Sequence, residues 1–239
     1  MLWWFTQGVC ALPAFLVIWS SGTFIISYII AIVRHDVEII FPYISDTGAN
    51  PPESCIFGLM TFIVACAAMA TIYARYKFVD KMNEDTRAVN QKLNLAALWI
   101  GLITCLGMCI VATFQETTMT IAHDIGAALF FVSGVLYIIL QSVISYQAFP
   151  FGATITVCWT RALIASIAAL AFFPTVICAG FVKRTDLHMK KDDPAYPFHV
   201  ASAACEWTVA FSFVCFFLTY IHEFKMFTLE VITEHAERS

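Results

Sequence analysis

The sequence predicts an all-α fold, a bundle of six transmembrane helices in a polytopic membrane protein. Of the 239 residues, 60% are apolar and 13% are charged, whereas soluble domains carry about 25% charged residues. The mean hydropathy is +0.79, and several uninterrupted apolar runs reach the roughly 20 residues with which a helix crosses a bilayer. We therefore expect a single six-span membrane domain over residues 1–239.

The apolar runs predict spans at residues 9–33, 56–73, 95–114, 121–144, 162–182 and 200–221. The first contains Pro13 and a small face of serine and threonine, which favours hydrogen bonds between helices. The second and the fifth are rich in alanine, which lets helix backbones approach closely. Ionisable residues lie near the end of the third span and near the beginning of the fourth and sixth spans. Pro174 is expected to kink the fifth span.

The positions of lysine and arginine predict the orientation, because basic residues concentrate in cytosolic loops. Five of them lie at residues 75–93, in the second loop, and Arg34 is alone in the first loop. The fifth loop has four basic residues although it lies on the side predicted to be non-cytosolic. The first two loops are given the greater weight in this prediction. An even number of spans puts both termini on one side, so the termini and residues 75–93 are expected in the cytosol.

Charge and cysteine patterns exclude several classes of function. The net charge of −4 and the scattered basic residues provide no surface for nucleic acid. Most of the nine cysteines lie inside apolar runs, and no CxxC pair or Cys/His cluster at metal-ligand spacing occurs, so we expect neither a metal site nor a cofactor. The serine-hydrolase elbow, the HExxH helix and the phosphate-binding glycine loop are absent as well.

Ionisable residues at membrane depth are the main candidates for function, because placing them there is costly. Glu206 lies six residues into the last span, about 9 Å below its non-cytosolic end at the rise of an α-helix. The topology brings five further polar residues to the same end: Gln115, Glu116, His123, Asp124 and His199.

Three interpretations of this cluster stay open. Carboxylates could accept hydrogen bonds from the loops and fasten the first loop to the bundle. The cluster could instead form a pocket for a lipid headgroup or a small solute, with histidines that respond to pH. It could also be an enzyme site in which Glu206 or Asp124 works as acid and base near His123.

The first loop carries the most distinctive string of the chain. It reads Pro42-Tyr43-Ile44-Ser45-Asp46-Thr47-Gly48 and continues with Pro51-Pro52-Glu53-Ser54, which is typical of a non-helical turn. Together with Trp19-Ser20-Ser21, Phe114-Gln115-Glu116, His123-Asp124 and Ala204-Cys205-Glu206-Trp207-Thr208, the string resembles the DNA damage-regulated autophagy modulator (DRAM) family. That family belongs to the wider Frag/DRAM/Sfk group of membrane proteins, and the short tail is most similar to its founding member.

The resemblance implies a lysosomal membrane protein that modulates autophagy and is linked to the DNA damage response and to apoptosis. Relatives in the wider group handle lipid at membranes, so the preferred hypothesis is that the bundle binds or organises membrane lipids. Two alternatives remain. One is an adaptor that binds a cytosolic protein through residues 75–93 and the tail. The other is a lipid-modifying enzyme with its site at the lumenal end.

Overall fold

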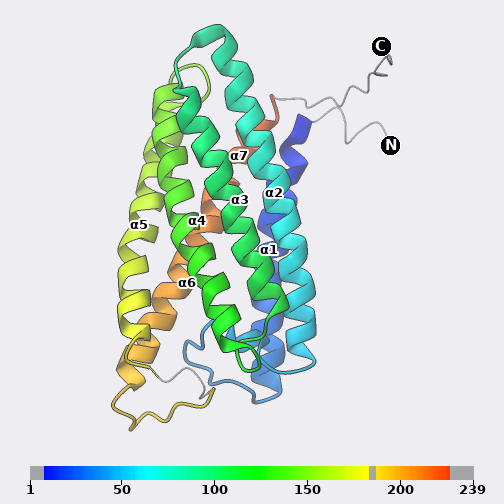
Figure 1. The fold of residues 1–239 in the computed structure, drawn as a ribbon, viewed down its shortest axis with the longest axis vertical. Helices are drawn as coiled ribbons and strands as arrows, with labels where there is room; N and C mark the ends of the chain where they lie inside the picture. Colours follow the sequence, from blue (N-terminus) through cyan, green and yellow to red (C-terminus); the bar gives the residue numbers. More distant parts are fainter. Residues whose placement is uncertain (1–7, 183–186, 227–239) are drawn as a thin grey trace.

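The computed structural model describes residues 8–182 and 187–226, and within these residues the fold is all-α (Figure 1). Six long helices make up the body of the protein: α1 (Ala11–Val33), α2 (Glu53–Thr86), α3 (Gln91–Thr113), α4 (Thr120–Ala148), α5 (Ile155–Ala179) and α6 (Tyr196–Leu218). The short elements are η1 (Gly8–Cys10), η2 (Asp46–Gly48) and α7 (Tyr220–Phe224). The predicted fold class, a bundle of six helices able to span a membrane, is confirmed.

Each long helix is apolar enough to cross a bilayer. Its most apolar 18-residue window has a mean hydropathy between 1.6 and 2.4. The outer surface carries large apolar side chains such as Ile18, Ile121 and Leu170, which are more than 70% exposed. So much exposed apolar surface fits hydrocarbon rather than water. The chain is a multi-pass membrane protein.

Consecutive helices lie side by side, and α6 returns to pack against α1 and closes the bundle (Figure 1). The buried core at the centre includes Ile72 of α2, Tyr137 of α4, Phe216 of α6 and Tyr220 of α7. Because α7 contacts η1, the two ends of the described chain meet at the same end of the bundle. The first loop, residues 34–52, lies at the opposite end.

Helices α3 and α4 approach each other most closely at two glycines. A Cβ atom at Gly107 would lie 2.5 Å from the backbone nitrogen of Phe130, and one at Gly126 would lie 2.6 Å from Ile110 Cγ2. Both distances are shorter than packed side chains allow, so glycine is required for this contact. Of the alanine-rich helices predicted to be buried, α2 buries Ala65, Ala67 and Ala68, whereas α5 has only 11% of its most apolar window buried.

The second loop, predicted at residues 74–93, is mostly helical. Hydropathy placed a loop after residue 73, but α2 continues to Thr86 and its connection to α3 comprises only residues 87–90. The extension carries i,i+3 ion pairs, Lys77–Asp80 at 3.7 Å and Lys81–Glu84, which favour helix. The region read as a loop is therefore a helical hairpin, the α2–α3 hairpin (residues 77–93), which extends past the neighbouring helices in Figure 1.

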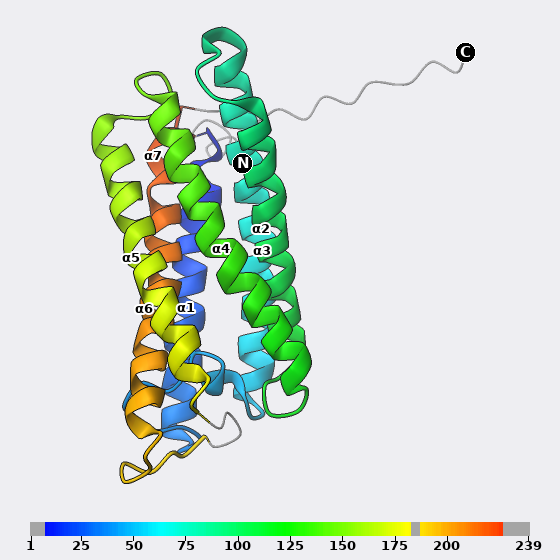
Figure 2. The same ribbon diagram turned by 60° about the vertical axis from the view of Figure 1, so that its left-hand side comes forward.

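Helix α4 crosses the bundle obliquely (Figure 2). It lies beside α5 at the end of the bundle where the two helices are connected. Toward the opposite end of the bundle, where the first loop lies, α4 diverges from α5. Its first half packs instead against α3 through Gly126. The divergence of α4 and α5 positions the site described next.

Candidate functional site

The first loop folds over one end of the bundle and is attached to α6. The backbone N–H of Ile44 donates a hydrogen bond to Glu206 Oε2 at 3.3 Å, and Trp207 Nε1 donates to the carbonyl oxygen of Pro42 at 2.8 Å. Tyr43 lies between these contacts, with its ring edge-on to the ring of His199 at 4.8 Å. Neighbouring residues of α6 therefore hold the loop at residues 42–44, which is the role that the structural interpretation assigned to Glu206.

Contacts within the loop fix its shape around η2. Asp46 accepts a hydrogen bond from the N–H of Tyr43 at 3.2 Å, and Thr47 Oγ1 donates to the carbonyl of Ile44 at 2.7 Å. The Thr47 hydroxyl also lies 3.1 Å from Ser27 Oγ of α1. A Cβ atom at Gly48 would come within 2.5 Å of the Phe57 ring. The loop thus packs on α1 and α2 as well as on α6.

A charged cluster joins the start of the loop to the start of α2. Arg34 Nε lies 3.2 Å from Asp36 Oδ2 and 3.4 Å from Glu53 Oε2, and Asn50 Nδ2 donates to Asp36 Oδ1 at 3.1 Å. Burial alone raises the pKa of Asp36, but hydrogen bonds from Glu53, Asn50 and Arg34, with the charge of Arg34, bring it below its ordinary value. Pro52 sits at the N-cap of α2, next to Glu53.

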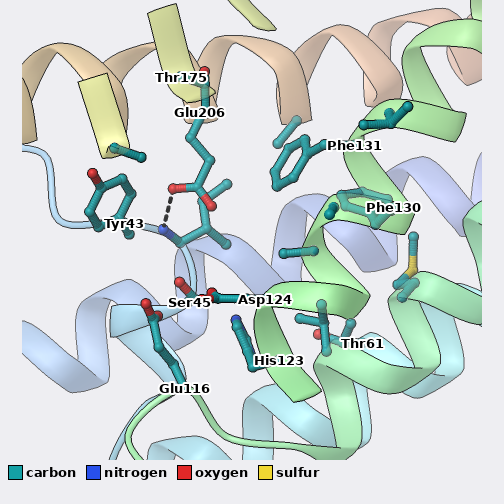
Figure 3. A pocket seen from close by; sticks show the side chains of 18 of the residues that line it. Tyr43, Ser45, Thr61, Glu116, His123, Asp124, Phe130, Phe131, Thr175 and Glu206 are labelled. Atoms are coloured by element: carbon teal, nitrogen blue, oxygen red, sulfur yellow. Dashed lines mark hydrogen bonds between the residues drawn. The ribbon is translucent and has the colours of Figure 1, made fainter. Parts of the chain in front are cut away.

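Beneath the loop lies a cavity of about 520 Å³, lined by residues of all six long helices and of the first loop. Figure 3 shows that its lining has two chemically different ends. The end under the loop is polar and includes Ser45, Glu116, His123, Asp124 and Glu206. The other end carries the rings of Phe130 and Phe131. The lining also includes further apolar side chains and four hydroxyl-bearing ones: Val64, Met108, Phe172, Ser20, Thr23, Thr61 and Thr175.

Glu116 is the most unusual member of the polar end. It lies in the short connection between α3 and α4, and only 4% of its surface is exposed. Its Oε2 atom has no hydrogen-bond partner among the described residues. Figure 3 shows the carboxyl group directed from that connection toward Ser45. Buried carboxylates are normally hydrogen-bonded, so this oxygen has room for a donor that the described residues do not supply.

His123 lies beside Glu116 on the first turn of α4. Its Nδ1 atom is 2.7 Å from the carbonyl oxygen of Phe114. A carbonyl oxygen accepts only, so Nδ1 donates and Nε2 is the ring nitrogen left to interact with an occupant of the cavity.

The structure separates the candidate residues into two groups. Glu116, His123, Asp124 and Glu206 line the cavity, and so do Tyr43 and Ser45 of the first loop. Gln115 does not line it; its Oε1 accepts a hydrogen bond from Thr118 at 3.3 Å. His199 packs behind Tyr43, outside the cavity. The remaining loop residues, Pro42, Asp46, Thr47, Gly48, Pro52 and Glu53, shape and anchor the loop.

A second buried polar cluster at the opposite end was missed by sequence reasoning. Arg75 Nη1 lies 2.6 Å from Glu223 Oε2, and Arg161 Nη1 lies 2.9 Å from Glu223 Oε1. Both arginines are fully buried. The ring of Tyr220 lies against both guanidinium groups, at 5.2 Å and 4.7 Å.

Neutral partners complete this cluster. Arg75 donates to Gln141 and Ser145, while Arg161 donates to Ser145 and Thr219. The cluster therefore joins α2, α4, α5 and α7. One feature of the sequence could have indicated this cluster. Arg161 comes directly before a long apolar run, and an ionisable residue at membrane depth is normally paired with another polar group.

Residues 8–227 match the family model described as the Frag1/DRAM/Sfk1/Cwh43P N-terminal domain. The chain is 45% identical over 230 residues to a mouse protein, DNA damage-regulated autophagy modulator protein 1, with 96% of this chain and 97% of that protein covered. It is 42% identical over 238 residues to the rat DNA damage-regulated autophagy modulator protein 2, with 96% and 89% covered. A zebrafish protein, modulator of macroautophagy TMEM150B, is 27% identical over 228 residues, with 95% and 90% covered. No solved structure matches the chain.

Proposed function

The chain belongs to the Frag1/DRAM/Sfk1/Cwh43P family, and from this premise we propose that it modulates autophagy from the lysosomal membrane by binding a lipid in the cavity beneath the first loop. Support for the role in autophagy comes from the names of the mouse, rat and zebrafish relatives. The lysosomal location and the link to stress-induced cell death rest on the resemblance noted in the sequence.

One observation carries the lipid-binding part of the proposal. The cavity joins a buried carboxylate that lacks a hydrogen-bond partner, Glu116, to a chamber lined by aromatic and aliphatic side chains. Its volume of about 520 Å³ falls in the roughly 300–1,000 Å³ range of small-molecule sites. A molecule with a polar head and an apolar chain satisfies both ends at once, whereas a small polar solute would leave the apolar end unfilled.

The proposed orientation places the first loop and the polar end of the cavity in the lumen. The α2–α3 hairpin, with its exposed Lys81, Arg87 and Lys92, then lies in the cytosol, as expected for basic residues. A pH-sensitive fluorescent protein fused after Ser239 tests this orientation, because it stays bright beside intact acidic lysosomes only if the C-terminus is cytosolic.

The lipid proposal is tested by filling the cavity. Ala127 of α4 lines it, and Ala127→Phe replaces a methyl group by a ring that projects into the space. The protein is purified in native membrane nanodiscs, the lipid that stays bound is measured by mass spectrometry, and autophagic flux is measured in cells that express the same variant. We expect both retained lipid and flux to fall several-fold.

Ala122→Phe is the matched control, because Ala122 lies on the same helix and does not line the cavity. It should leave retained lipid and flux unchanged. If Ala127→Phe folds and retains as much lipid as the unmodified protein, the cavity does not bind lipid and the proposal fails.

The α2–α3 hairpin favours a second function, an adaptor that binds a cytosolic protein. It projects from the bundle (Figure 1) and exposes both basic and acidic side chains. Arg75, which the sequence grouped with this surface, is buried and cannot contact a partner; residues 227–239 of the tail lie outside the described residues.

The adaptor function is tested by replacing Lys81, Arg87 and Lys92 together with glutamine. An adaptor should lose autophagic flux while it retains lipid in the cavity. A protein that acts through bound lipid should keep both.

A further inference from the structure

The described residues that line the cavity include several carboxylates. Three carboxylates line its polar end: Glu116, from the connection between α3 and α4; Asp124, from α4; and Glu206, from α6. His123 is the one lining residue that can become positive, and no lysine or arginine is among the described residues that line the cavity. Figure 3 shows the three carboxyl groups on one side of the cavity and the rings of Phe130 and Phe131 on the other.

The buried oxygen of Glu116 indicates what the occupant must offer. A carboxylate oxygen accepts hydrogen bonds and donates none when ionised. Glu116 is 96% buried, since its exposed fraction is 4%, and its Oε2 has no donor among the described residues. A bound group that donates hydrogen bonds and carries positive charge would compensate for this burial.

An anionic headgroup does the opposite. A phosphate or carboxylate placed at the polar end would lie beside the buried Glu116 oxygen that lacks a partner, with no lysine or arginine among the described lining residues to pair with it. Like charges at such short range repel strongly where water is excluded. The polar end therefore selects against acidic lipids, and it discriminates by charge rather than by shape.

The apolar lining indicates that the rest of the ligand is a hydrocarbon chain. Val64, Met108 and Phe172 come from three different helices and, with Phe130 and Phe131, give the lining a large apolar surface. A flexible alkyl chain matches such a surface through dispersion contacts and the release of water. The total volume of about 520 Å³ is that of a site for one small molecule.

The route into the cavity lies between α4 and α5. Val132 of α4 and Val176 of α5 both line the cavity, and their side chains are 53% and 55% exposed. They lie on the two helices that diverge toward the first loop in Figure 2. In a bundle that spans a membrane, this side opening, which we call the α4–α5 portal, faces hydrocarbon.

From the charges, the buried Glu116 and the portal, we propose that the occupant is a single-chain amphiphile with a cationic amine headgroup that enters from the bilayer through the α4–α5 portal. The inference rests on the proposed lipid-binding function and names the chemical class of the ligand. The ammonium group lies at Glu116 and donates the hydrogen bond that Glu116 Oε2 lacks. The chain lies along Phe130 and Phe131.

The test holds the chain constant and varies the charge of the headgroup. The full-length protein is placed in nanodiscs of neutral phosphatidylcholine and titrated with oleylamine, oleyl alcohol or oleate, and bound ligand is counted by native mass spectrometry. A charge-assisted hydrogen bond in place of a neutral one changes affinity by about tenfold or more. We expect oleylamine to bind at least about tenfold more tightly than oleyl alcohol, and oleate to bind most weakly.

Two variants assign the preference to the cavity. Glu116→Gln removes the charge at nearly constant shape and should reduce the preference for the amine by about tenfold. Glu38→Gln is the matched control, since Glu38 lies in the first loop at the same end of the bundle and its side chain is 55% exposed. It should leave the preference unchanged.

The possible results separate this inference from the function on which it rests. Equal binding of the three ligands, or a preference that Glu38→Gln reduces as much as Glu116→Gln, overturns the amine class and leaves lipid binding in place. Binding of none of the three, together with no retained lipid in the unmodified protein, overturns both.

The portal is tested by the rate of ligand uptake. Val176→Trp places a large ring at the opening and should slow the uptake of oleylamine several-fold. Ile177→Trp is the control, because Ile177 is 60% exposed on the same helix and does not line the cavity. Equal uptake rates for the two variants would overturn the portal.

Discussion

Replacement of Glu223 by glutamine is expected to destabilise the protein far more than the loss of a single hydrogen bond. The carboxylate of Glu223 is in contact with Arg75 at 2.6 Å and with Arg161 at 2.9 Å, and both arginines are fully buried. Glu223→Gln keeps the shape of the side chain but leaves two guanidinium charges in the interior without a counter-charge, because arginine stays protonated in proteins.

The magnitude follows from the balance of charge. Two opposite charges 4 Å apart attract by about 4 kcal/mol at an effective dielectric constant of 20, and removing one partner of a buried ion pair costs about 3–5 kcal/mol. The neutral partners Gln141, Ser145 and Thr219 remain, so a loss in this range, rather than the sum of two pairs, is expected. For a chain of this size it lowers the melting temperature by roughly 6–20 °C.

Thermal unfolding of the purified protein in detergent measures the effect, and two further variants make it specific. Glu84→Gln removes the carboxylate of the exposed Lys81–Glu84 pair and should change stability by less than about 1 kcal/mol. Arg161→Gln lowers the charge of the cluster from +1 to zero, since Arg75 and Glu223 remain as a pair. It should therefore be less destabilising than Glu223→Gln. The reasoning is refuted if Glu223→Gln is no worse than Glu84→Gln, or milder than Arg161→Gln.

Three further predictions concern the first loop, and each is checked by thermal unfolding. Gly48→Ala places a Cβ atom 2.5 Å from the Phe57 ring and should destabilise by about 1–3 kcal/mol; no change would mean that the loop is not packed there. Trp207→Phe loses the hydrogen bond to Pro42 and should cost about 1 kcal/mol, with a larger loss pointing to ring packing instead. The pKa of Asp36 is below its ordinary value of 3.8, so its contribution is complete above that pH and is lost as the pH falls through the lowered pKa. Asp36→Asn should therefore destabilise at pH 7, and its effect should fade only as the pH falls below 3.8. An effect at pH 7 that vanishes by pH 5 contradicts this order.

Hydropathy was sufficient to predict the helices but not the end of α2. The mean hydropathy of a window reports where a chain meets hydrocarbon, and a helix that continues into water has no such signal. Lys77, Asp80, Lys81 and Glu84 were read as loop charges, but their i,i+3 spacing is also that of ion pairs along a helix. The spacing was present in the sequence and was outweighed by the fall in hydropathy.

The sequence predicted polar residues at one end of the bundle. It did not indicate which of them anchor the first loop and which have an oxygen without a hydrogen-bond partner. Glu116 and Glu206 had the same expected role, yet Glu206 accepts a hydrogen bond from Ile44, 162 positions away, while Glu116 Oε2 has no partner among the described residues. Such pairings depend on the path of the first loop over the bundle. For the same reason the pairing of Arg75 with Glu223, separated by 148 positions, could not be predicted from local patterns.

The proposed α4–α5 portal has a consequence for which lipids the protein can meet. Val176 lies near the end of α5 (Ile155–Ala179), on the side of the first loop. A molecule that enters there is drawn from one leaflet of the bilayer, and lipids of the opposite leaflet reach the cavity only after they flip across the membrane. Occupancy of the cavity would then follow the composition of a single leaflet. A change in lipid asymmetry would alter it even where the total lipid content of the membrane stays constant.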